Sequence, residues 1–355
     1  MQLALRLAAR GLGRVFPNPA VGCVIVDSDG HIVGRGWTQD GGRPHSETEA
    51  LIAAGAKAEG ATAFVTLEPC AHHGQTGPCA EALINAKVAR VVSALEDPDP
   101  RVAGRGHEAL RFAGIDVRVG VLQAQAQELN AGFLSRVQRG RPFVTLKLAT
   151  TLDGMIALPT GQSQWITGVL AREHGHLMRS QHDAVMVGIG TALADDPELT
   201  CRLPGLEHRR LVRVVVDSRG RIPTDSKLVC SASKQPVWLL TRTETATQHL
   251  VERHVKVISA DSSGHDVDLQ SGLTLLAQEG ITRVMVEGGA QLASSLLKEG
   301  LVDQLLWYRA PSVMGEGASA VSGLGVTQLV ELPRFIRKET IRLGEDVLET
   351  YRIAT

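Results

Sequence analysis

Three potential metal ligands near the start of the chain constrain its fold, because a metal site must bring them to one point. His45 is followed by Glu47, then by the pair Pro69-Cys70, and then by Cys79. One His and two Cys form a tetrahedral zinc site with an open fourth position, as in catalytic sites where zinc lowers the pKa of bound water. Glu47 matches a carboxylate that does not bind the metal and that moves protons. This order of residues predicts a zinc-dependent hydrolytic deaminase with one zinc ion per chain.

The spacing of the two cysteines departs from the usual deaminase signature, in which two residues separate the pair. Here residues 71–78 separate them, and Gly74 and Pro78 in this segment are suitable turn formers. If Cys70 ends a strand and Cys79 opens the next helix, the loop can return the second thiolate to the same metal.

Two other interpretations of these residues stay open. In the first, both cysteines are small buried core residues and His45 lies beside a helix N-cap. In the second, His72 or His73 is the fourth ligand of a closed structural zinc site, which leaves Glu47 without a task. A non-catalytic binding protein stabilised by zinc is the functional counterpart of these interpretations.

The composition limits the partners and the compartment. A chain of 355 residues is long enough for two domains, and its formal net charge is -1. No run of Lys and Arg interleaved with aromatic residues is present, so we expect small-molecule substrates and no nucleic-acid partner. No segment has the length of a membrane span, so we expect no membrane partner and a cytoplasmic location. Cys23, Cys201 and Cys230 fit reduced thiols. A homo-oligomer is compatible with the sequence, which leaves the oligomeric state open.

Apolar runs that alternate with helical periodicity predict an α/β fold in both halves. In the first half we expect helices at 3–11, 46–57, 79–86, 102–113 and 123–136, and strands at 21–26, 31–37, 62–67, 90–95 and 115–119. The segment Gly140-Arg141-Pro142 marks a boundary between domains 1–140 and 141–355. In the second half we expect strands at 143–148, 184–187, 211–216, 237–240, 255–258, 283–287 and 304–308.

The second domain lacks the Gly-x-Gly-x-x-Gly fingerprint of standard dinucleotide-binding folds. Residues 284–291 instead predict a buried strand that ends in Gly288 and Gly289 and opens a helix. Backbone N–H groups at such a turn can bind a phosphate or a pyrophosphate. An ordinary strand-to-helix turn explains the same pattern, so the residues alone leave the role of this turn open.

Several motifs, in one order, carry a resemblance to a known family. Nearly from end to end, the chain resembles the bifunctional riboflavin-biosynthesis proteins that join a diaminohydroxyphosphoribosylaminopyrimidine deaminase to a 5-amino-6-(5-phosphoribosylamino)uracil reductase. The matching segments are 17–22, 44–47, 66–74, 102–106, 146–148, 152–154, 163–167, 194–197 and 287–289. The long loop between Cys70 and Cys79 is typical of this family.

The resemblance implies a cytidine-deaminase-like α/β/α first domain and a dihydrofolate-reductase-like α/β second domain that uses NADPH. In the first domain it implies that His45, Cys70 and Cys79 bind zinc. It also implies that Glu47 moves protons and that Asn18 contacts the pyrimidine. In the second it implies cofactor contacts from Trp165, Thr191, Asp195, Ser218, Gly289, Ala290, Gln291 and Leu292. The implied substrate contacts are Ser163, Arg179, Leu199, Arg202 and Glu287, of which the arginines suit a ribose phosphate.

The resemblance implies two reactions. Zinc-dependent hydrolysis deaminates 2,5-diamino-6-(5-phosphoribosylamino)pyrimidin-4-one, and NADPH then reduces the ribosyl group of 5-amino-6-(5-phosphoribosylamino)uracil to ribityl. The proton donor of the reduction stays open among Lys147, Asp153 and Glu287. A 2′-phosphate on the cofactor needs a basic neighbour, for which Arg219 or Arg221 is suited, although a solvated turn explains them equally.

One departure from the family and two rival functions remain. Gln75 stands where the family commonly has a basic residue, so a phosphate contact in the deaminase site is weaker or is supplied elsewhere. A deaminase that acts on RNA or free nucleosides would share the zinc motif but would leave the second domain unexplained. A second domain that had become an interaction module would leave hydrolysis intact and abolish NADPH-dependent turnover.

Overall fold

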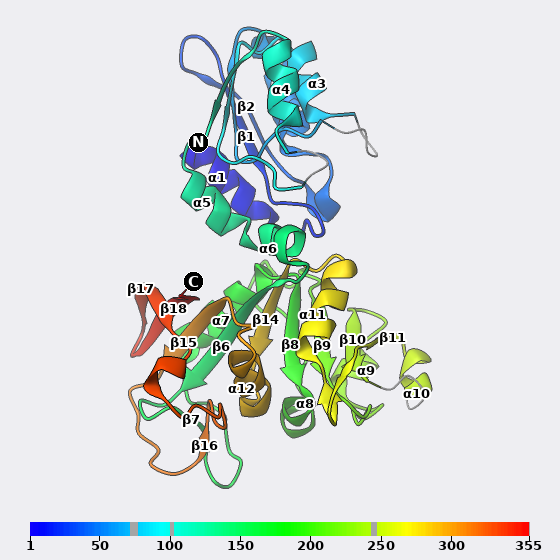
Figure 1. Ribbon diagram of the computed structural model, residues 1–355, viewed down its shortest axis with the longest axis vertical. Helices are drawn as coiled ribbons and strands as arrows, with labels where there is room; N and C mark the ends of the chain where they lie inside the picture. Colours follow the sequence, from blue (N-terminus) through cyan, green and yellow to red (C-terminus); the bar gives the residue numbers. More distant parts are fainter. Residues whose placement is uncertain (72–76, 100–102, 243–246, 355) are drawn as a thin grey trace. The chain divides into compact units, whose positions relative to one another are not determined.

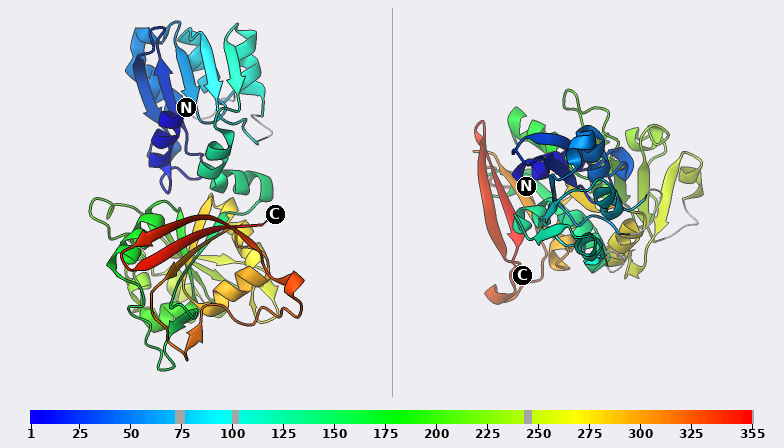
Figure 2. Two further views of the ribbon diagram at one scale, coloured as in Figure 1. Left: turned by 90° about the vertical axis from the view of Figure 1, so that its left-hand side faces the viewer. Right: turned by 90° about the horizontal axis from the view of Figure 1, so that it is seen from above.

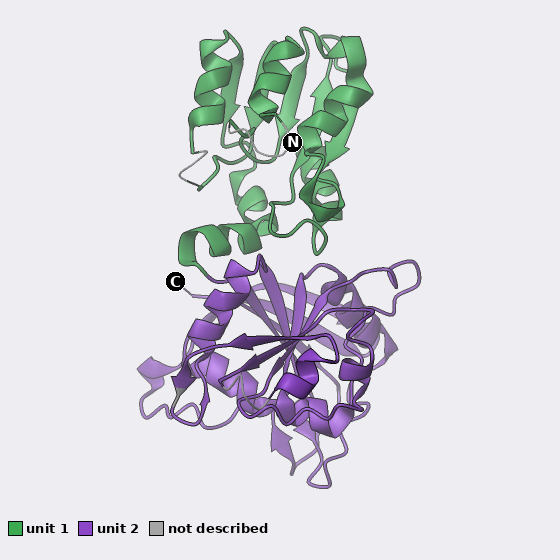
Figure 3. Ribbon diagram, turned by 90° about the vertical axis from the view of Figure 1, so that its right-hand side faces the viewer, with its two compact units in different colours: residues 1–140 green, residues 141–355 purple. Residues whose placement is uncertain are grey.

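The computed structural model describes residues 1–71, 77–99, 103–242 and 247–354. The chain divides into two compact units, of which unit 1 comprises Met1–Gly140 and unit 2 comprises Arg141–Thr355 (Figure 3). The last helix of unit 1, α6 (Ala131–Arg139), ends at Gly140, whose φ of 67° lies in the left-handed region that favours glycine. Each unit has its own main sheet, and both units are α/β as expected.

Unit 1 is built on five strands, which are β1 (Gly22–Val26), β2 (Ile32–Trp37), β3 (Thr62–Val65), β4 (Arg90–Ser93) and β5 (Asp116–Val119). They lie in the order β2-β1-β3-β4-β5. β1 is antiparallel to β2 and β3, whereas β3, β4 and β5 are parallel. Because parallel strands end at the same edge of a sheet, the segments after β3 and β4 can line one site.

Helices cover both faces of this sheet (Figure 1). α1 (Gln2–Ala8) and α2 (Ser46–Ala54) approach it closely because glycines face them. A Cβ atom on Gly22 would lie 2.0 Å from a backbone oxygen of α1, and one on Gly36 would lie 2.1 Å from a backbone oxygen of α2. The register of β1 and β2 puts these two glycines on opposite faces. The other described helices of the unit are α3 (Cys79–Asn85), α4 (Arg105–Phe112) and α5 (Gln123–Leu129), with 3-10 turns at Ala9–Gly11, Asp40–Gly42 and Gly55–Ala58.

Two helices differ from the sequence-based expectation. The helix expected at 123–136 is divided into α5 and α6 at Asn130, whose side chain accepts a hydrogen bond from the backbone N–H of Ala20 at 3.0 Å and donates one to its carbonyl at 3.1 Å. This tertiary contact holds the junction. The helix expected at 102–113 begins at Arg105, and Val102 lies outside the described residues.

Unit 2 contains a nine-stranded sheet. In sheet order its strands are β11 (Val255–Ser259), β10 (Val237–Thr241), β9 (Val212–Val216), β8 (Ala184–Gly188), β14 (Arg283–Glu287), β6 (Phe143–Thr150), β15 (Gln304–Arg309), β18 (Asp346–Ile353) and β17 (Phe335–Leu343). Neighbouring strands from β11 to β15 are parallel, and β18 and β17 are added as an antiparallel hairpin at the C-terminus (red in Figure 2). The parallel strands are buried apolar runs, as expected for strands covered on both faces.

The helices of unit 2 connect these strands. They are α7 (Val169–Ser180), α8 (Ile189–Asp195), α9 (Lys227–Cys230), α10 (Gln248–Val251), α11 (Leu269–Gln278) and α12 (Ala290–Lys298). Two small strand pairs complete the unit, β7 (Met155–Ala157) with β16 (Ala318–Ser319) and β12 (Ser262–Ser263) with β13 (Asp266–Val267). Over the part of the chain that the structure describes, none of the helices is both long and apolar enough to span a membrane.

Candidate functional site

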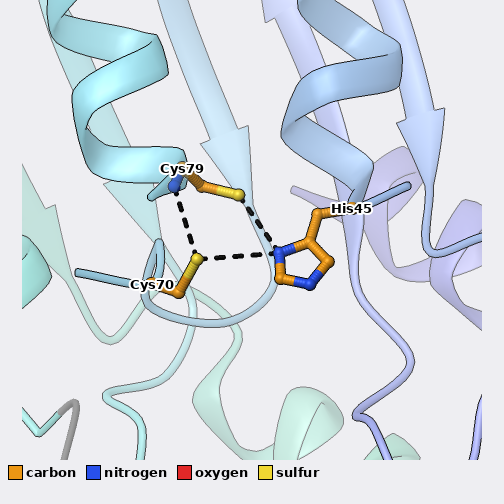
Figure 4. A group of neighbouring side chains, drawn as sticks. All are labelled: His45, Cys70 and Cys79. Carbon is orange, nitrogen blue, oxygen red and sulfur yellow. Dashed lines mark hydrogen bonds between the residues drawn. The ribbon is translucent and has the colours of Figure 1, made fainter. Parts of the chain in front are cut away.

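The structure brings the three predicted metal ligands together (Figure 4). His45 immediately precedes α2, Cys70 follows β3, and Cys79 is the first residue of α3. Nδ1 of His45 lies 3.2 Å from Sγ of Cys79 and 3.6 Å from Sγ of Cys70. The backbone N–H of Cys79 also donates to Sγ of Cys70 at 3.3 Å. All three side chains therefore point toward a common centre.

This donor set fits a zinc ion. The three ligand atoms lie within 4.8 Å of one another. Zn–N and Zn–S bonds of about 2.0 and 2.3 Å place neighbouring ligands of a tetrahedral site about 3.5 Å apart, close to the separations of His45 from the cysteines. Hydrogen bonds from Cys79 and from His45 lower the pKa of Cys70 to about 4, although burial opposes the shift. The same hydrogen bond and burial raise the pKa of Cys79. Among the described residues, one imidazole and two sulfurs supply three of the four ligands of a tetrahedral site.

Glu47 lies on the first turn of α2, and its side chain is buried. Burial raises the pKa of Glu47 above its ordinary value, and the neighbouring Cys70 raises it further. The hydroxyl of Ser46 donates a hydrogen bond to one carboxylate oxygen at 2.8 Å. A buried carboxyl with a raised pKa, beside a metal site, is suited to accept and return protons.

Of these residues, His45, Glu47 and Cys70 line a cavity of about 130 Å³ together with several other side chains. Asn18, which the family resemblance places against the pyrimidine, lines it as expected. The sequence analysis did not single out the other polar lining residues, which are Thr38, Arg43, Glu68, Asp97 and Asp99. Burial raises the pKa of Asp97 to about 6. Asp97 and Asp99 follow β4, which is parallel to β3. The pairing of these two strands was the signal that could have identified both residues as part of the site. His72, His73 and Gln75 lie outside the described residues.

Unit 2 contains a larger cavity of about 930 Å³. Seven of the eight residues expected to contact the cofactor line it, namely Thr191, Asp195, Ser218, Gly289, Ala290, Gln291 and Leu292. Gly288 and Gly289 have φ of 78° and 81°, and a Cβ atom on Gly289 would lie 3.2 Å from Oγ1 of Thr191. The turn between β14 and α12 therefore presents backbone to the cavity, beside α8.

The cavity also holds cationic side chains that bear on cofactor choice. Arg221 lines it and its Nε atom lies 3.2 Å from an oxygen of the buried Asp217. Lys298, on the last turn of α12, also lines it, and sequence reasoning did not identify this residue. Arg219, the alternative to Arg221, is absent from the lining residues that the structure describes. The position of Lys298 one helix length after the glycine turn was the only signal for it.

Trp165 is the one expected cofactor contact that the described lining of this cavity does not include. Its side chain is exposed, and the guanidinium of Arg172 lies over its ring, 4.7 Å from the centroid. Of the expected substrate contacts, Ser163 lines the cavity. Arg179, Leu199, Arg202 and Glu287 do not belong to the described lining.

Arg179 and Glu287 instead form a buried ion pair next to the cavity. Arg179 donates two hydrogen bonds to the carboxylate of Glu287, one of them at 2.8 Å, and a third to the carbonyl of Thr200 at 2.8 Å. Lys147, which lines the cavity, lies 3.9 Å from Glu287 and pairs with it in the register of β6 and β14. Burial opposes ionisation, but Arg179 and then Lys147 lower the pKa of Glu287 to about 2. Burial lowers the pKa of Lys147, against the charge of Glu287.

The remaining predicted residues lie at the edge of this pair. Leu199 is buried, whereas Arg202 is exposed and pairs with Glu198 at 3.3 Å. The backbone N–H of Arg202 donates to His176 at 3.4 Å, and Arg179 contacts the same ring nitrogen at 3.5 Å. His176 thus links the expected substrate residues, and burial followed by the nearby Arg179 charge lowers its pKa to about 4.

Comparison with known proteins decides the family. The family described as "RibD C-terminal domain" matches residues 142–348, and the family described as "Cytidine and deoxycytidylate deaminase zinc-binding region" matches residues 1–95. The riboflavin biosynthesis protein RibD of Escherichia coli (strain K12) is 44% identical over 361 residues, which cover 98% of this chain and 96% of that protein. The chain belongs to the RibD family. The RibD of Aquifex aeolicus (strain VF5) is 41% identical, with 98% of this chain and 96% of the relative covered.

Solved RibD structures agree with this assignment. Acinetobacter baumannii RibD, form 1, has a TM-score of 0.91 at 38% identity and covers 100% of this chain and 98% of that chain. A deaminase/reductase from Thermotoga maritima has a TM-score of 0.89 at 36% identity, with 100% and 97% covered. As a member of this family, the chain is a bifunctional enzyme of riboflavin biosynthesis, with a zinc-binding deaminase region and a reductase domain. The predictions of family, fold class and paired activities are confirmed.

Proposed function

We propose that residues 1–140 deaminate 2,5-diamino-6-(5-phosphoribosylamino)pyrimidin-4-one and that residues 141–355 reduce the ribosyl group of 5-amino-6-(5-phosphoribosylamino)uracil with NADPH. The grouping of His45, Cys70 and Cys79, two of which line one cavity with Glu47, in a chain of the RibD family, carries this proposal. The relative from Thermotoga maritima is described by the same two activities. A cytoplasmic location fits the five unpaired cysteines of the chain.

In the deaminase site, the protein's residues divide the work by position. Zinc on His45, Cys70 and Cys79 would supply a water molecule activated at neutral pH. Glu47 would accept two protons in turn from that water, passing the first to the ring nitrogen and the second to the departing amine. Asn18 offers both an N–H donor and an oxygen acceptor to the pyrimidine.

In the reductase site, the cavity of unit 2 accepts the cofactor. The turn at Gly288 and Gly289 exposes backbone N–H groups at the start of α12, a nine-residue helix, where a pyrophosphate binds favourably. NADPH supplies the hydride for the anomeric carbon of the ribosyl group. Arg221 and Lys298 line the same cavity and are suited to a 2′-phosphate.

Contacts and charge support one of the three candidate proton donors for the reduction. Asp153 accepts hydrogen bonds from the backbone N–H groups of Met314 and Gly315 and does not line the described cavity. Glu287 is held ionised by Arg179, so it carries no proton at neutral pH. Lys147 lines the cavity, is an ammonium with a lowered pKa, and is therefore the residue that we assign as proton donor.

A coupled assay tests the proposal. The purified, zinc-loaded protein is given the diaminopyrimidine ribosyl phosphate, and ammonia release is followed before NADPH is added. Ammonia release followed by NADPH oxidation is the expected result. Ammonia without NADPH oxidation would reduce unit 2 to a partner module, and neither reaction, with zinc present at one per chain, would favour a structural zinc site.

A further inference from the structure

Glu68 is a buried carboxylate next to the zinc ligands. Among the described residues it accepts four backbone hydrogen bonds, from Asp97, Gly104, Gly106 and His107. Oε2 accepts from the backbone N–H of Asp97 at 3.1 Å and of Gly104 at 3.0 Å. Oε1 accepts from the N–H of Gly106 at 2.8 Å and of His107 at 3.2 Å. Both oxygens of Glu68 are thus engaged with the segment that runs from the end of β4 into α4.

The segment is also pressed against the residue that follows Glu68. A Cβ atom on Gly106 would lie 1.9 Å from the carbonyl oxygen of Pro69, which immediately precedes Cys70. Only glycine permits this approach without a shift of backbone. The ring of His107 is buried, with Nδ1 3.8 Å from Oε2 of Glu68. The start of α4 therefore packs directly against Glu68 and Pro69, which precede Cys70.

The contact reaches the deaminase cavity through two acidic residues. Asp97 and Asp99 both line that cavity, as does Glu68. Oδ1 of Asp97 accepts from the N–H of Asp99 at 2.9 Å, and the carbonyl of Asp99 accepts from the N–H of Ala103 at 2.8 Å. The bond from Asp97 N–H to Glu68 fixes the first member of this chain. The carboxylate of Glu68 is thereby bonded to the backbone of Asp97, whose side chain is bonded in turn to the backbone of Asp99.

We propose that Glu68 is a positioning residue for deamination, which holds Asp97 and Asp99 where they accept hydrogen bonds from N–H and O–H groups of the pyrimidine ribosyl phosphate. The inference rests on the proposed deaminase function and adds a role for residues that it leaves unused. Carboxylates accept such bonds strongly because the acceptor is charged. Glu68 acts through Asp97 and Asp99 and does not itself touch the reacting atoms.

The test is a double-mutant cycle with Glu68→Gln and Asp97→Asn, read as kcat and KM for ammonia release. Glu68→Gln keeps the shape of the side chain but turns an N–H donor toward backbone donors. Each single variant is expected to raise KM about 10- to 100-fold, the range for a lost hydrogen bond to a charged group. Because Glu68 acts through Asp97, the double variant is expected to be no worse than Asp97→Asn alone. Glu96→Gln, an exposed neighbour on the same segment, is the matched control and is expected to be unchanged.

Zinc content and the reductase activity of the same chains separate positioning from general damage. Both are expected to stay at the wild-type level in every variant. Independent, additive effects of the two substitutions would overturn the inference, and so would an unchanged KM in Glu68→Gln. If the wild-type protein releases ammonia, the proposed function stands in either case. A wild-type protein without ammonia release would overturn both. If Glu68→Gln loses zinc, Gly106→Ala replaces it in the cycle, since its Cβ displaces the same segment and leaves the carboxylate intact; a wild-type KM in Gly106→Ala would then contradict the inference.

Discussion

The two units each hold a buried carboxylate at their candidate site, and the surroundings of these carboxylates are opposite. Glu47 in unit 1 accepts a hydrogen bond from the hydroxyl of Ser46, and burial raises its pKa. Glu287 in unit 2 accepts hydrogen bonds from Arg179 and lies near Lys147, and its pKa is lowered to about 2. A carboxyl that is easy to protonate can carry protons, whereas one that stays ionised can only orient cations. Similar burial therefore supports two different roles.

The sites around these carboxylates also differ in construction. The cavity in unit 1, of about 130 Å³, is lined by side chains with distinctive chemistry, among them a histidine, a cysteine and several carboxylates. The cavity in unit 2, of about 930 Å³, is lined largely by small residues and turns, such as Gly288 and Gly289. The first kind of site suits a metal and a small ring, and the second suits an extended cofactor.

The largest effect is expected from Glu47→Gln, which removes the carboxyl able to accept a proton but keeps its size. Ammonia release should fall by about 10²- to 10⁴-fold, the usual contribution of general acid–base catalysis. Zinc content should not change, because Glu47 is not a ligand. Glu49→Gln, on the same turn of α2, is the control and should retain activity. Ammonia release at the wild-type rate in Glu47→Gln would contradict the claim that Glu47, unlike Glu287, carries protons.

Glu287→Gln is expected to destabilise unit 2 by about 3–5 kcal/mol, the cost of leaving a buried partner charge unpaired. Here that charge belongs to Arg179. Denaturant unfolding followed by the fluorescence of Trp238 and Trp307, both in unit 2, measures it. Glu279→Gln breaks a more exposed pair with Lys256 and should cost at most about 1 kcal/mol. Equal losses in the two variants would show that the pair of Glu287 is an ordinary surface pair.

The same carboxylate predicts how stability depends on pH. The pKa of Glu287 falls from its ordinary value of 4.5 to about 2 on folding. Its contribution to the free energy of unfolding is therefore complete above pH 4.5 and is lost as the pH falls toward 2, about 3 kcal/mol in all. The difference in unfolding free energy between wild type and Glu287→Gln should shrink over this range. A difference that stays constant from pH 7 to pH 3 would contradict the assigned environment.

The smallest effect is expected at the cofactor end of the cavity in unit 2. Arg221→Ser should raise KM for NADPH about tenfold, equivalent to about 1.4 kcal/mol, and should leave KM for NADH unchanged. Arg219→Ser is the matched control, since Arg219 does not line the described cavity. If both cofactors are weakened equally, Arg221 does not read the 2′-phosphate, and Lys298 becomes the residue to change.

The metal site was predictable from sequence because its ligands carry rare chemistry in a fixed order, and short elements bring them together. Asp97 and Asp99 were missed because their place depends on which strand lies beside β3, a long-range pairing with no local signal. The parallel strands of unit 2 were predicted from their apolar runs. The hairpin of β17 and β18 was not, because most of β17 is exposed and lacks such a run. The pair of Arg179 and Glu287 joins α7 to β14, and no sequence pattern reveals such a contact.

The most direct test of two separate sites supplies each variant with the substrate of the other reaction. Glu47→Gln is given 5-amino-6-(5-phosphoribosylamino)uracil and NADPH, and Lys147→Met is given the diaminopyrimidine ribosyl phosphate. Glu47→Gln should oxidise NADPH at the wild-type rate and Lys147→Met should release ammonia at the wild-type rate, while each loses its own reaction. Loss of both reactions in either folded, zinc-loaded variant would contradict the assignment of one activity to each unit.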